Sequence, residues 1–587
     1  MIKFLISNCL RQIKRFSLSQ VRYISDVQRK IQKSYYFMHG DFNLSSSTVG
    51  EVLNETADKH GDNIAFISSH QGISKNYSEF RKETEQLASG LISNGLKRGD
   101  RIAICAPNCY EWAIVQFAAA KAGLILVTLN PALRPNELKY YLNKVRCKAL
   151  VSWDVLKTQD FYDIYCELIP ELPKCNPNQL KTSNLPHLEK IVMISKEQKE
   201  GTLNFMNVFE SSSKESYEAL STIENSIQFD DPVNIQFTSG TTGMSKGATL
   251  SHHNIVNNSV VSGRRLGYNL TKPIICCQVP LFHCFGCVFG TLMSVIFQGT
   301  CIFPSPTFDA NASLKTIEQH GCNIVYGTPT MYVDLLHNYR SHQRNIASLK
   351  QAVIGGAPAT EPLVRDVRNE LQLSSVHMAY GSTENSPCVA LNGINDSFEN
   401  ACKEVLQPVE YVEVKVVDDK QHLLPINMEG ELCVRGHGLF RGYWDDEQRT
   451  AEVVDEKTFW YHTGDLCVMN EYGFLKISGR KKDMIIRGGE NIYPLEIENF
   501  LNSHPDILEA HIVGVPDKRR GEEVCAWISV KEGADLTEEE VKKYCKGKIS
   551  HFKVPRYIMF VKEFPKTASQ KVKKFEMKNI SIKELNL

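Results

Sequence analysis

The chain has 587 residues, and its 67 lysines and arginines balance its 67 aspartates and glutamates. This balance leaves no global electric field that would favour a nucleic acid as partner. The length suggests about four folding units of ~150 residues each. A hydrophobic content of 42% is ordinary for a globular protein.

The 18 cysteines follow no regular spacing. Such a distribution is typical of free thiols in a reducing compartment and not of a disulfide framework. Cys284 and Cys287 form one C-x-x-C pair, but no second ligand pair with zinc-site spacing accompanies it. We therefore expect two buried thiols here.

The first 25 residues form a basic segment that contains no acidic residue. On a helical wheel the basic side chains fall within an arc of roughly 100°, and apolar residues lie outside that arc. This pattern resembles a mitochondrial transit peptide and predicts processing near Arg22 and a location in the mitochondrial matrix. A disordered or surface-bound basic tail is the alternative. The basic set is Arg11, Lys14, Arg15 and Arg22.

The most apolar stretch runs from Trp112 to Leu129 and includes Gln116 and Lys121. A membrane-spanning helix needs about 20 apolar residues without a central charge. The stretch is therefore interpreted as a buried helix followed by a strand, and no membrane-spanning segment is expected.

Strand-like and helix-like segments alternate from about Thr48 to Arg480, which predicts α/β layers with buried strands. Beyond Arg480 a second unit is expected, with a helix at 496–501, strands at 510–515 and 524–530, and a helix capped by Thr537. The predicted architecture is α/β: a large N-terminal domain at 40–480 and a small, basic α+β domain at 481–587.

A Gly- and hydroxyl-rich loop follows a predicted strand at 233–237. Its glycines let backbone N–H groups approach an anion, its hydroxyls add donors, and its lysine suits a polyphosphate. It is not a Walker A loop, because two residues separate the last glycine from the lysine. The loop consists of Thr238, Ser239, Gly240, Thr241, Thr242, Gly243, Met244, Ser245 and Lys246.

This string resembles the signature of the adenylate-forming superfamily, which includes acyl-CoA synthetases, aryl-CoA ligases, beetle luciferases and peptide-synthetase adenylation domains. Further motifs of that family recur in order and cover nearly the whole chain after the basic segment. The resemblance implies a multi-layer N-terminal domain and a small mobile C-terminal lid. It also implies ATP, Mg²⁺ and CoA as ligands.

The resemblance extends to the residues that hold the nucleoside. Gly356 and Ala357 match the adenine loop, and Tyr380 matches the aromatic residue that stacks on adenine. Asp465, in a Thr-Gly-Asp motif, matches the carboxylate that accepts from the two ribose hydroxyls.

Three residues match the family's catalytic positions. Thr383 would donate to the α-phosphate, and Glu384 would bind Mg²⁺, which prefers carboxylate and phosphate oxygens. Lys571 matches the lid lysine that grips the acid carboxylate and the α-phosphate. Gln570 stands where the family usually has glycine, and a non-glycine residue in a left-handed conformation costs roughly 1–2 kcal/mol.

The remaining matches concern the movement of the lid and the two channels. Arg480 matches a contact to ribose and phosphate, and Lys482 matches the position about which the lid rotates. Gly488 and Gly489 resemble the loop that lines the pantetheine channel. His283 lies in a segment that resembles the border of the acid channel, where an ordering, a gating and a structural role all remain open.

The implied reaction has two halves. The acid attacks the α-phosphorus of ATP and pyrophosphate leaves, and then Lys571 withdraws as the lid rotates and CoA attacks the acyl-adenylate. The overall sequence is similar to the mitochondrial medium-chain member of the family, so we expect a medium-chain fatty acid as substrate. An aryl or 4-coumarate-type CoA ligase, a luciferase-like adenylating enzyme, and a non-catalytic nucleotide-binding regulator remain as alternatives.

Overall fold

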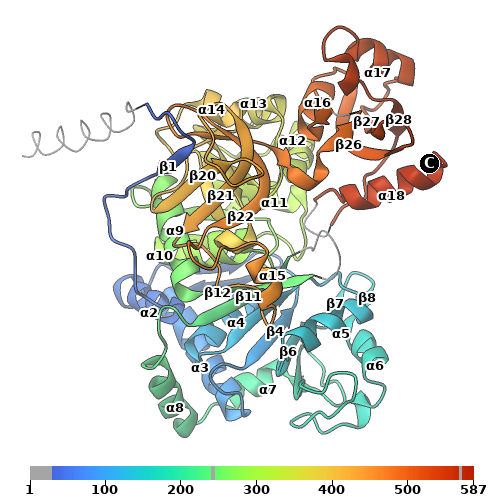
Figure 1. Cartoon of the computed structure of the whole chain (residues 1–587). Helices are drawn as coiled ribbons and strands as arrows, with labels where there is room; N and C mark the ends of the chain where they lie inside the picture. Colours follow the sequence, from blue (N-terminus) through green and yellow to red (C-terminus); the bar gives the residue numbers. More distant parts are fainter. Residues whose placement is uncertain (1–29, 239–244, 489, 568–570) are drawn as a thin grey trace, which may run out of the picture.

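The computed structural model describes residues 30–238, 245–488, 490–567 and 571–587 (Figure 1). A large N-terminal domain contains three large sheets and a two-stranded one, and a small C-terminal domain lies at one side of it. This arrangement confirms the predicted fold class. The predicted transit segment, residues 1–25, lies outside the described residues.

The first large sheet has seven strands in the order β10-β9-β6-β4-β5-β11-β12. Its strands run parallel except β12, which forms an antiparallel edge with β11. The strands are β4 (Arg101–Cys105), β5 (Ile125–Leu129), β6 (Ala149–Trp153), β9 (Lys190–Ile194), β10 (Leu203–Asn204), β11 (Pro232–Thr238) and β12 (Lys246–Ser251).

Both faces of this sheet are buried, as strand β4 illustrates. Ile102 and Ile104 face one core, whereas Ala103 and Cys105 face another, because successive side chains of a strand point to opposite sides. Helices α3 (Tyr77–Ser93) and α4 (Tyr110–Lys121) pack into the first core. Helices α5 (Pro135–Lys144) and α6 (Phe161–Leu168) pack into the second.

The apolar stretch from Trp112 to Leu129 forms most of α4 and all of β5, as expected. Lys121 is fully buried at the end of α4, where Glu224 lies 2.6 Å from its ammonium and Asn54 accepts a hydrogen bond at 2.7 Å. These partners offset the cost of burying the charge. Among the described residues, no helix is both long and apolar enough to cross a bilayer.

A second sheet has eight strands in the order β18-β17-β16-β15-β13-β14-β2-β3 and is parallel except at its edges. One continuous core joins it to the first sheet, with helix α9 (His252–Arg265) among the elements between them. The strands are β2 (Ile64–Ser68), β3 (Ile73–Asn76), β13 (Ile274–Cys277), β14 (Thr300–Phe303), β15 (Ile324–Gly327), β16 (Gln351–Gly355), β17 (Ser375–Gly381) and β18 (Cys388–Leu391).

A third, antiparallel sheet has the order β1-β20-β21-β22-β23-β19. Its edge strand β1 (Tyr35–Phe37) precedes residue 40, where the sequence suggested that the domain begins. The other strands are β19 (Val405–Leu406), β20 (Val412–Val417), β21 (Glu429–Gly436), β22 (Tyr461–Met469) and β23 (Leu475–Arg480).

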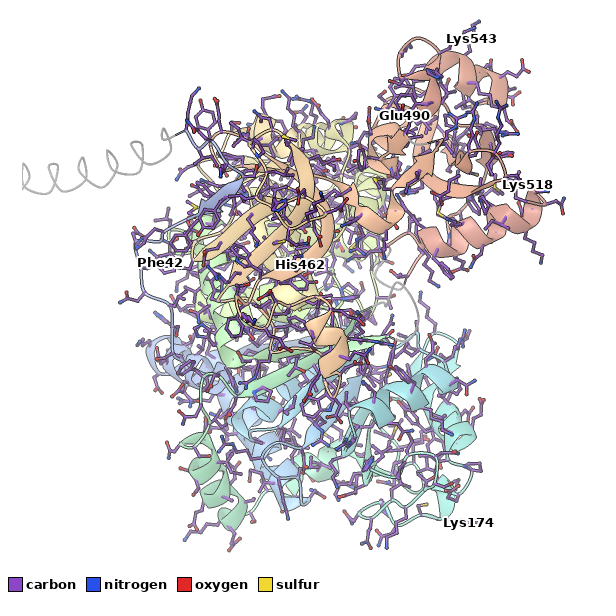
Figure 2. All side chains as sticks on the ribbon, viewed as in Figure 1. Phe42, Lys174, His462, Glu490, Lys518 and Lys543 are labelled. Atoms are coloured by element: carbon purple, nitrogen blue, oxygen red, sulfur yellow. The ribbon has the colours of Figure 1, made fainter. Side chains whose placement is uncertain are left out.

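The C-terminal lid follows a short 3-10 turn at Lys481–Asp483 and has its own core. Its sheet contains β24 (Ile485–Arg487), β25 (Glu490–Ile492), β26 (Ile507–Asp517), β27 (Gly521–Val530) and β28 (Tyr557–Phe560). Helices α16 (Pro494–Leu501), α17 (Glu538–Cys545) and α18 (Lys574–Glu584) complete it, and Thr537 caps α17 as expected. Lys518 and Lys543 project from its surface (Figure 2).

All 17 cysteines of the described residues are free, and 15 of them are buried. Cys284 and Cys287 are among the buried thiols, as expected, and burial raises the pKa of Cys287 to about 12. The two half-buried exceptions are Cys166 and Cys175.

Candidate functional site

The phosphate loop connects the two strands of a hairpin. Strands β11 and β12 pair in antiparallel register, with Thr238 opposite Lys246. Residues 239–244 of the predicted loop lie outside the described residues, whereas Thr238, Ser245 and Lys246 are described. The hairpin therefore fixes the two ends between which the loop runs.

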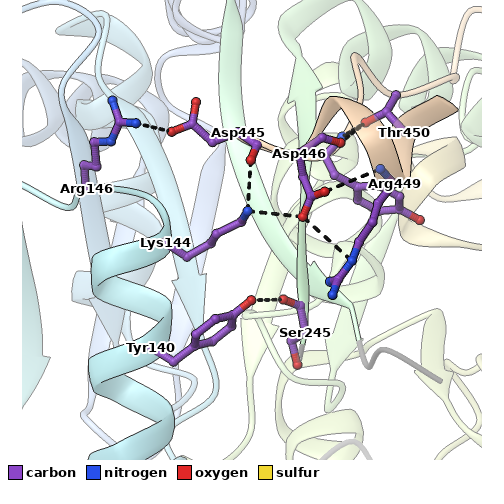
Figure 3. A network of polar contacts seen from close by, with 9 residues as sticks. Tyr140, Lys144, Arg146, Ser245, Asp445, Asp446, Arg449 and Thr450 are labelled. Carbon is purple, nitrogen blue, oxygen red and sulfur yellow. Dashed lines mark hydrogen bonds and ion pairs between the residues drawn. The ribbon is translucent and has the colours of Figure 1, made fainter. Parts of the chain in front are cut away.

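Two tyrosines of α5, Tyr140 and Tyr141, contact Ser245 at the C-terminal end of this loop; the Tyr140 contact is drawn in Figure 3. The Tyr140 hydroxyl donates to the backbone oxygen of Ser245 at 2.9 Å, and the Tyr141 hydroxyl lies 2.8 Å from the Ser245 hydroxyl. The Tyr141 ring also stacks on Phe237 of β11, with 4.1 Å between ring centroids. Helix α5 thus contacts β11 and Ser245, the residue directly before β12.

The same face of α5 holds a second segment beside the loop (Figure 3). The Lys144 ammonium lies 3.1 Å from the carboxylate of Asp446 and donates to the backbone oxygen of Asp445. Arg146 pairs with the Asp445 carboxylate at 2.6 Å. Asp446 also caps helix α15 (Glu447–Ala451), so these contacts fix the start of that helix.

The segment Phe440–Trp444, which precedes these aspartates, runs along β12. The Trp444 N–H donates to the backbone oxygen of Gly247, and Tyr443 pairs with Ala248. This places the Tyr443 ring under the ammonium of Lys246, 4.7 Å from the ring centroid. The Tyr443 hydroxyl donates to Glu384 at 2.8 Å.

Glu384 and Thr383 lie in a 3-10 turn, Thr383–Asn385, directly after β17. Glu384 is 8% exposed, so its carboxylate is largely shielded from water. Burial raises the pKa of the Tyr443 phenol beside it, and the negative charge of Glu384 raises it further. The phenol therefore stays protonated and remains a hydrogen-bond donor to the carboxylate.

A polar cluster connects the second and third sheets at the expected nucleoside position. The Tyr380 hydroxyl donates to Asp465 at 2.6 Å, and the Arg480 guanidinium lies 3.3 Å from the same carboxylate. Asp465 and Arg480 are direct partners in the register of β22 and β23. Burial raises the pKa of Asp465, and the charge of Arg480 acts against that shift.

Lys571 reaches this cluster from the lid. A Cβ added to Gly356 would lie 3.5 Å from Cε of Lys571, which shows how closely the side chain approaches the adenine loop. Gly356 has a φ of +86°, a conformation that favours glycine. Lys571 itself keeps a solvent-exposed surface.

The electrostatic environment of Lys571 is mixed. Reduced hydration lowers its pKa, and repulsion from Arg480 adds to the effect, whereas Asp465 and Glu384 oppose it. Burial lowers the pKa of His283 to about 3, with a further contribution from the charge of Lys571. His283 is therefore neutral at physiological pH and can offer a hydrogen bond without a second positive charge.

The predicted hinge and channel residues lie on the lid side of Arg480. Lys482 is in the connecting 3-10 turn, and burial followed by repulsion from Arg480 lowers its pKa. Gly488 has a φ of +61°, and its N–H donates to the backbone oxygen of Arg520 at 2.7 Å. Gly489 lies outside the described residues, as does Gln570.

One further contact at the adenine loop was not expected from the sequence. The carboxylate of Glu404 accepts a hydrogen bond from the Ala359 N–H at 2.5 Å, directly after the loop. Burial raises the pKa of Glu404 to about 7, against the opposing effects of this bond and of Lys476.

The structure brings Lys571 of the lid close to Gly356, Asp465, Arg480 and Glu384 of the large domain, so several of the predicted site residues lie together. It also adds residues that the sequence reasoning missed, chiefly Tyr140, Tyr141 and Tyr443. The aromatic run at 440–444 was a visible signal. Its partners on β12, however, are almost 200 residues away, and one sequence does not show such pairings.

Comparison with known proteins identifies the class to which this chain belongs. Residues 53–444 match the family model of the AMP-binding enzymes, and residues 496–571 match the model of the AMP-binding enzyme C-terminal domain. The chain therefore belongs to the AMP-binding enzyme family, and the predicted superfamily is confirmed.

Similar proteins with established names indicate more narrowly where the chain lies within this family. The chain is 43% identical over 555 residues to a zebrafish (Danio rerio) protein named medium-chain acyl-CoA ligase ACSF2, mitochondrial, covering 94% of this chain and 91% of the relative. It is 40% identical over 591 residues to the human protein of the same name, covering 100% and 94% of the two chains.

Solved structures agree with the fold. The ATP-bound structure of MatB from Rhodopseudomonas palustris has a TM-score of 0.78 at 25% identity, covering 91% of this chain and 99% of that one. The apo structure of the same protein gives a TM-score of 0.69.

Proposed function

We propose that this protein is an ATP-dependent medium-chain acyl-CoA ligase that forms acyl-AMP with release of pyrophosphate and then the acyl-CoA thioester. The observation that carries this proposal is the approach of Lys571 to Gly356, beside Asp465, Arg480 and Glu384. The similarity to the proteins named medium-chain acyl-CoA ligase supports the acid class.

In the first half-reaction the chain's own groups position the reactants. Asp465 accepts from the ribose hydroxyls, Tyr380 offers its ring to adenine, and the phosphate loop with Lys246 cradles the polyphosphate. Negative charge grows on the α-phosphate as the acid oxygen attacks, so Thr383 and Lys571 are needed as a donor and a cation there. Because no covalent enzyme intermediate is required, positioning accounts for most of the catalysis.

Glu384 suits a magnesium ion. No group of three or more potential ligand side chains gathers anywhere in the described part of the chain, so an all-protein metal cage is not found there. Mg²⁺ commonly uses one or two carboxylates together with substrate phosphates and water. When bound, it would neutralise charge on the phosphates, while the single carboxylate of Glu384 holds it at the site.

In the second half-reaction CoA must reach the carbonyl carbon of the acyl-adenylate. We infer that the lid turns about Lys482, which withdraws Lys571 and brings the loop at Gly488 to the cleft. A glycine with positive φ at position 488 lets the pantetheine arm pass close to the backbone. The thiol sulfur then forms the thioester bond as AMP leaves.

The test is an assay of acid-dependent AMP release, with and without CoA, across straight-chain acids from four to sixteen carbons and with 4-coumarate. We expect a maximum at medium chain length and stimulation by CoA. Stronger turnover of 4-coumarate would overturn the acid class, and a lack of stimulation by CoA would overturn the choice of acceptor.

We also propose that the protein acts in the mitochondrial matrix. The basic, acid-free segment before Asp26 and the mitochondrial names of the relatives support this location. Import of the full chain into isolated mitochondria should yield a shortened, protease-protected product. A variant with Arg11, Lys14, Arg15 and Arg22 replaced by glutamine should remain outside, and its import at the normal rate would contradict the proposal.

A further inference from the structure

Tyr443 contacts both Lys246, the cation of the phosphate loop, and Glu384, the candidate magnesium ligand. The ammonium of Lys246 lies 4.7 Å from the centroid of the Tyr443 ring, and the Tyr443 hydroxyl donates to Glu384 at 2.8 Å. A cation over an aromatic face and a hydrogen bond to a carboxylate both favour one fixed geometry. One side chain therefore connects the loop cation with the candidate metal ligand.

The backbone holds Tyr443 firmly in this place. It is 7% exposed, its segment pairs with β12 at Ala248, and its N–H donates to the Thr450 hydroxyl at 2.9 Å. Phe440 packs edge-on against its ring at 4.9 Å, and the Phe440 N–H donates to the backbone oxygen of Glu384 at 2.9 Å. The turn that carries Glu384 and the strand that carries Lys246 are thus joined through one short segment.

We propose that Tyr443 is a positioning residue that sets Glu384 and Lys246 at a fixed separation for the magnesium complex of ATP. The inference rests on the proposed adenylating function but concerns only the binding of the nucleotide. An oriented carboxylate and an oriented cation favour the metal-bound nucleotide, because less conformational freedom is lost when it binds.

Two substitutions separate the two contacts of Tyr443. Tyr443→Phe keeps the ring under Lys246 and removes the donor to Glu384, whereas Tyr443→Leu removes both contacts. Tyr165→Phe is a matched control, because the buried Tyr165 hydroxyl donates to Ser152 at 2.6 Å in the other core of the first sheet. Calorimetric titration of the full chain with ATP, in excess Mg²⁺ and separately in EDTA, is the measurement.

Loss of a hydrogen bond to a charged group should weaken the affinity of Tyr443→Phe for ATP in Mg²⁺ about tenfold. Its affinity for ATP in EDTA should stay within about twofold of wild type, because the ring still supports Lys246. Tyr443→Leu should lose affinity under both conditions, and Tyr165→Phe under neither.

Equal losses by Tyr443→Phe with and without Mg²⁺, or no loss at all, would overturn the inference. Equal losses would show a general packing defect. If the wild-type chain binds magnesium–ATP but releases no AMP with any acid, the proposed function is wrong. The inference about Tyr443 concerns only nucleotide binding and would still hold. A wild-type chain that binds no ATP would overturn both.

Discussion

At the scale of single residues, substitution of Lys571 tests whether this side chain acts in the first half-reaction and not in the second. It is the lid residue that lies against the adenine loop, and it shares an electrostatic environment with Arg480, Asp465 and Glu384. Removing one hydrogen-bond donor from a developing oxyanion typically costs about 10²–10³-fold in rate. We expect Lys571→Ala to slow acid-dependent ATP–pyrophosphate exchange about 100- to 1,000-fold.

The same variant should retain partial activity in forming the thioester from a supplied acyl-adenylate, because the proposed rotation of the lid withdraws Lys571 from the site in that step. Single-turnover measurements of thioester formation provide the comparison. Equal loss of both half-reactions would contradict the division.

The raised pKa of Glu404 predicts that the free energy of unfolding depends on pH. Its folded pKa of about 7 lies above the ~4.3 of an unfolded glutamate, so the folded state holds the proton more tightly. Its contribution to stability is therefore complete below about pH 4 and is lost as the pH rises through 7. Glu404→Gln keeps an acceptor for the Ala359 N–H and cannot ionise.

We expect Glu404→Gln to be more stable than wild type at pH 8, by roughly 1–2 kcal/mol after allowing for partial exposure, and nearly equal at pH 4. Thermal unfolding followed between pH 4 and 8 measures this. A difference between the two proteins that does not change with pH would rule out the ionisation of Glu404 as its cause.

Residue identities at the site could be named from the sequence where a motif carried them, as with Asp465, Arg480 and Lys571. Tyr443 and Glu404 could not be named in this way. Each acts through one contact to a distant segment, and a tyrosine or a glutamate in isolation is compatible with many surroundings.

At the scale of elements, helix α5 determines where the phosphate loop ends. The Tyr140→Phe/Tyr141→Phe double variant removes both hydroxyl contacts to Ser245 and keeps the stacking of Tyr141 on Phe237. Each lost hydrogen bond is worth about 0.5–1.5 kcal/mol. We expect the KM for ATP to rise about five- to tenfold with little change in thermal midpoint.

Tyr162→Phe is the control for this pair. It removes one hydroxyl contact, to the backbone of Glu200 at 3.0 Å, from the neighbouring helix α6. If this variant raised the KM for ATP as much as the double variant does, the effect would not arise from the loop.

Many individual elements could be predicted from the sequence, because alternating or continuous apolar runs define β4, α4, β5 and β11. The placement of β1 could not. It joins the third sheet only through β20, whose residues lie almost 380 positions later. Pairings at such separations depend on the whole packed domain and not on local patterning.

At the scale of the whole molecule, the two domains are joined through the short turn at Lys481–Asp483. Proline fits the first turn of a helix and fixes φ at about −65°, which restricts rotation of the backbone there. We expect Lys482→Pro to keep acyl-adenylate formation within about fivefold of wild type and to slow thioester formation about 100-fold.

Lys482→Ala separates restriction from loss of charge, because it removes the ammonium without fixing φ. Pyrophosphate exchange and CoA-dependent single turnovers should be measured for both variants. If the alanine variant were as slow as the proline variant in thioester formation, the charge and not the rotation would be responsible.

The shielded cysteines make the movement of the lid accessible to spectroscopy. Replacing Cys166, Cys175 and the N-terminal Cys9 would leave only buried thiols, and maleimide dyes react slowly with these. Cysteines introduced at the exposed Lys174 and Lys543, which lie on the large domain and on the lid, would then accept a donor–acceptor dye pair (Figure 2). Energy transfer between the dyes could report each turn of the lid during catalysis without removal of the native core cysteines.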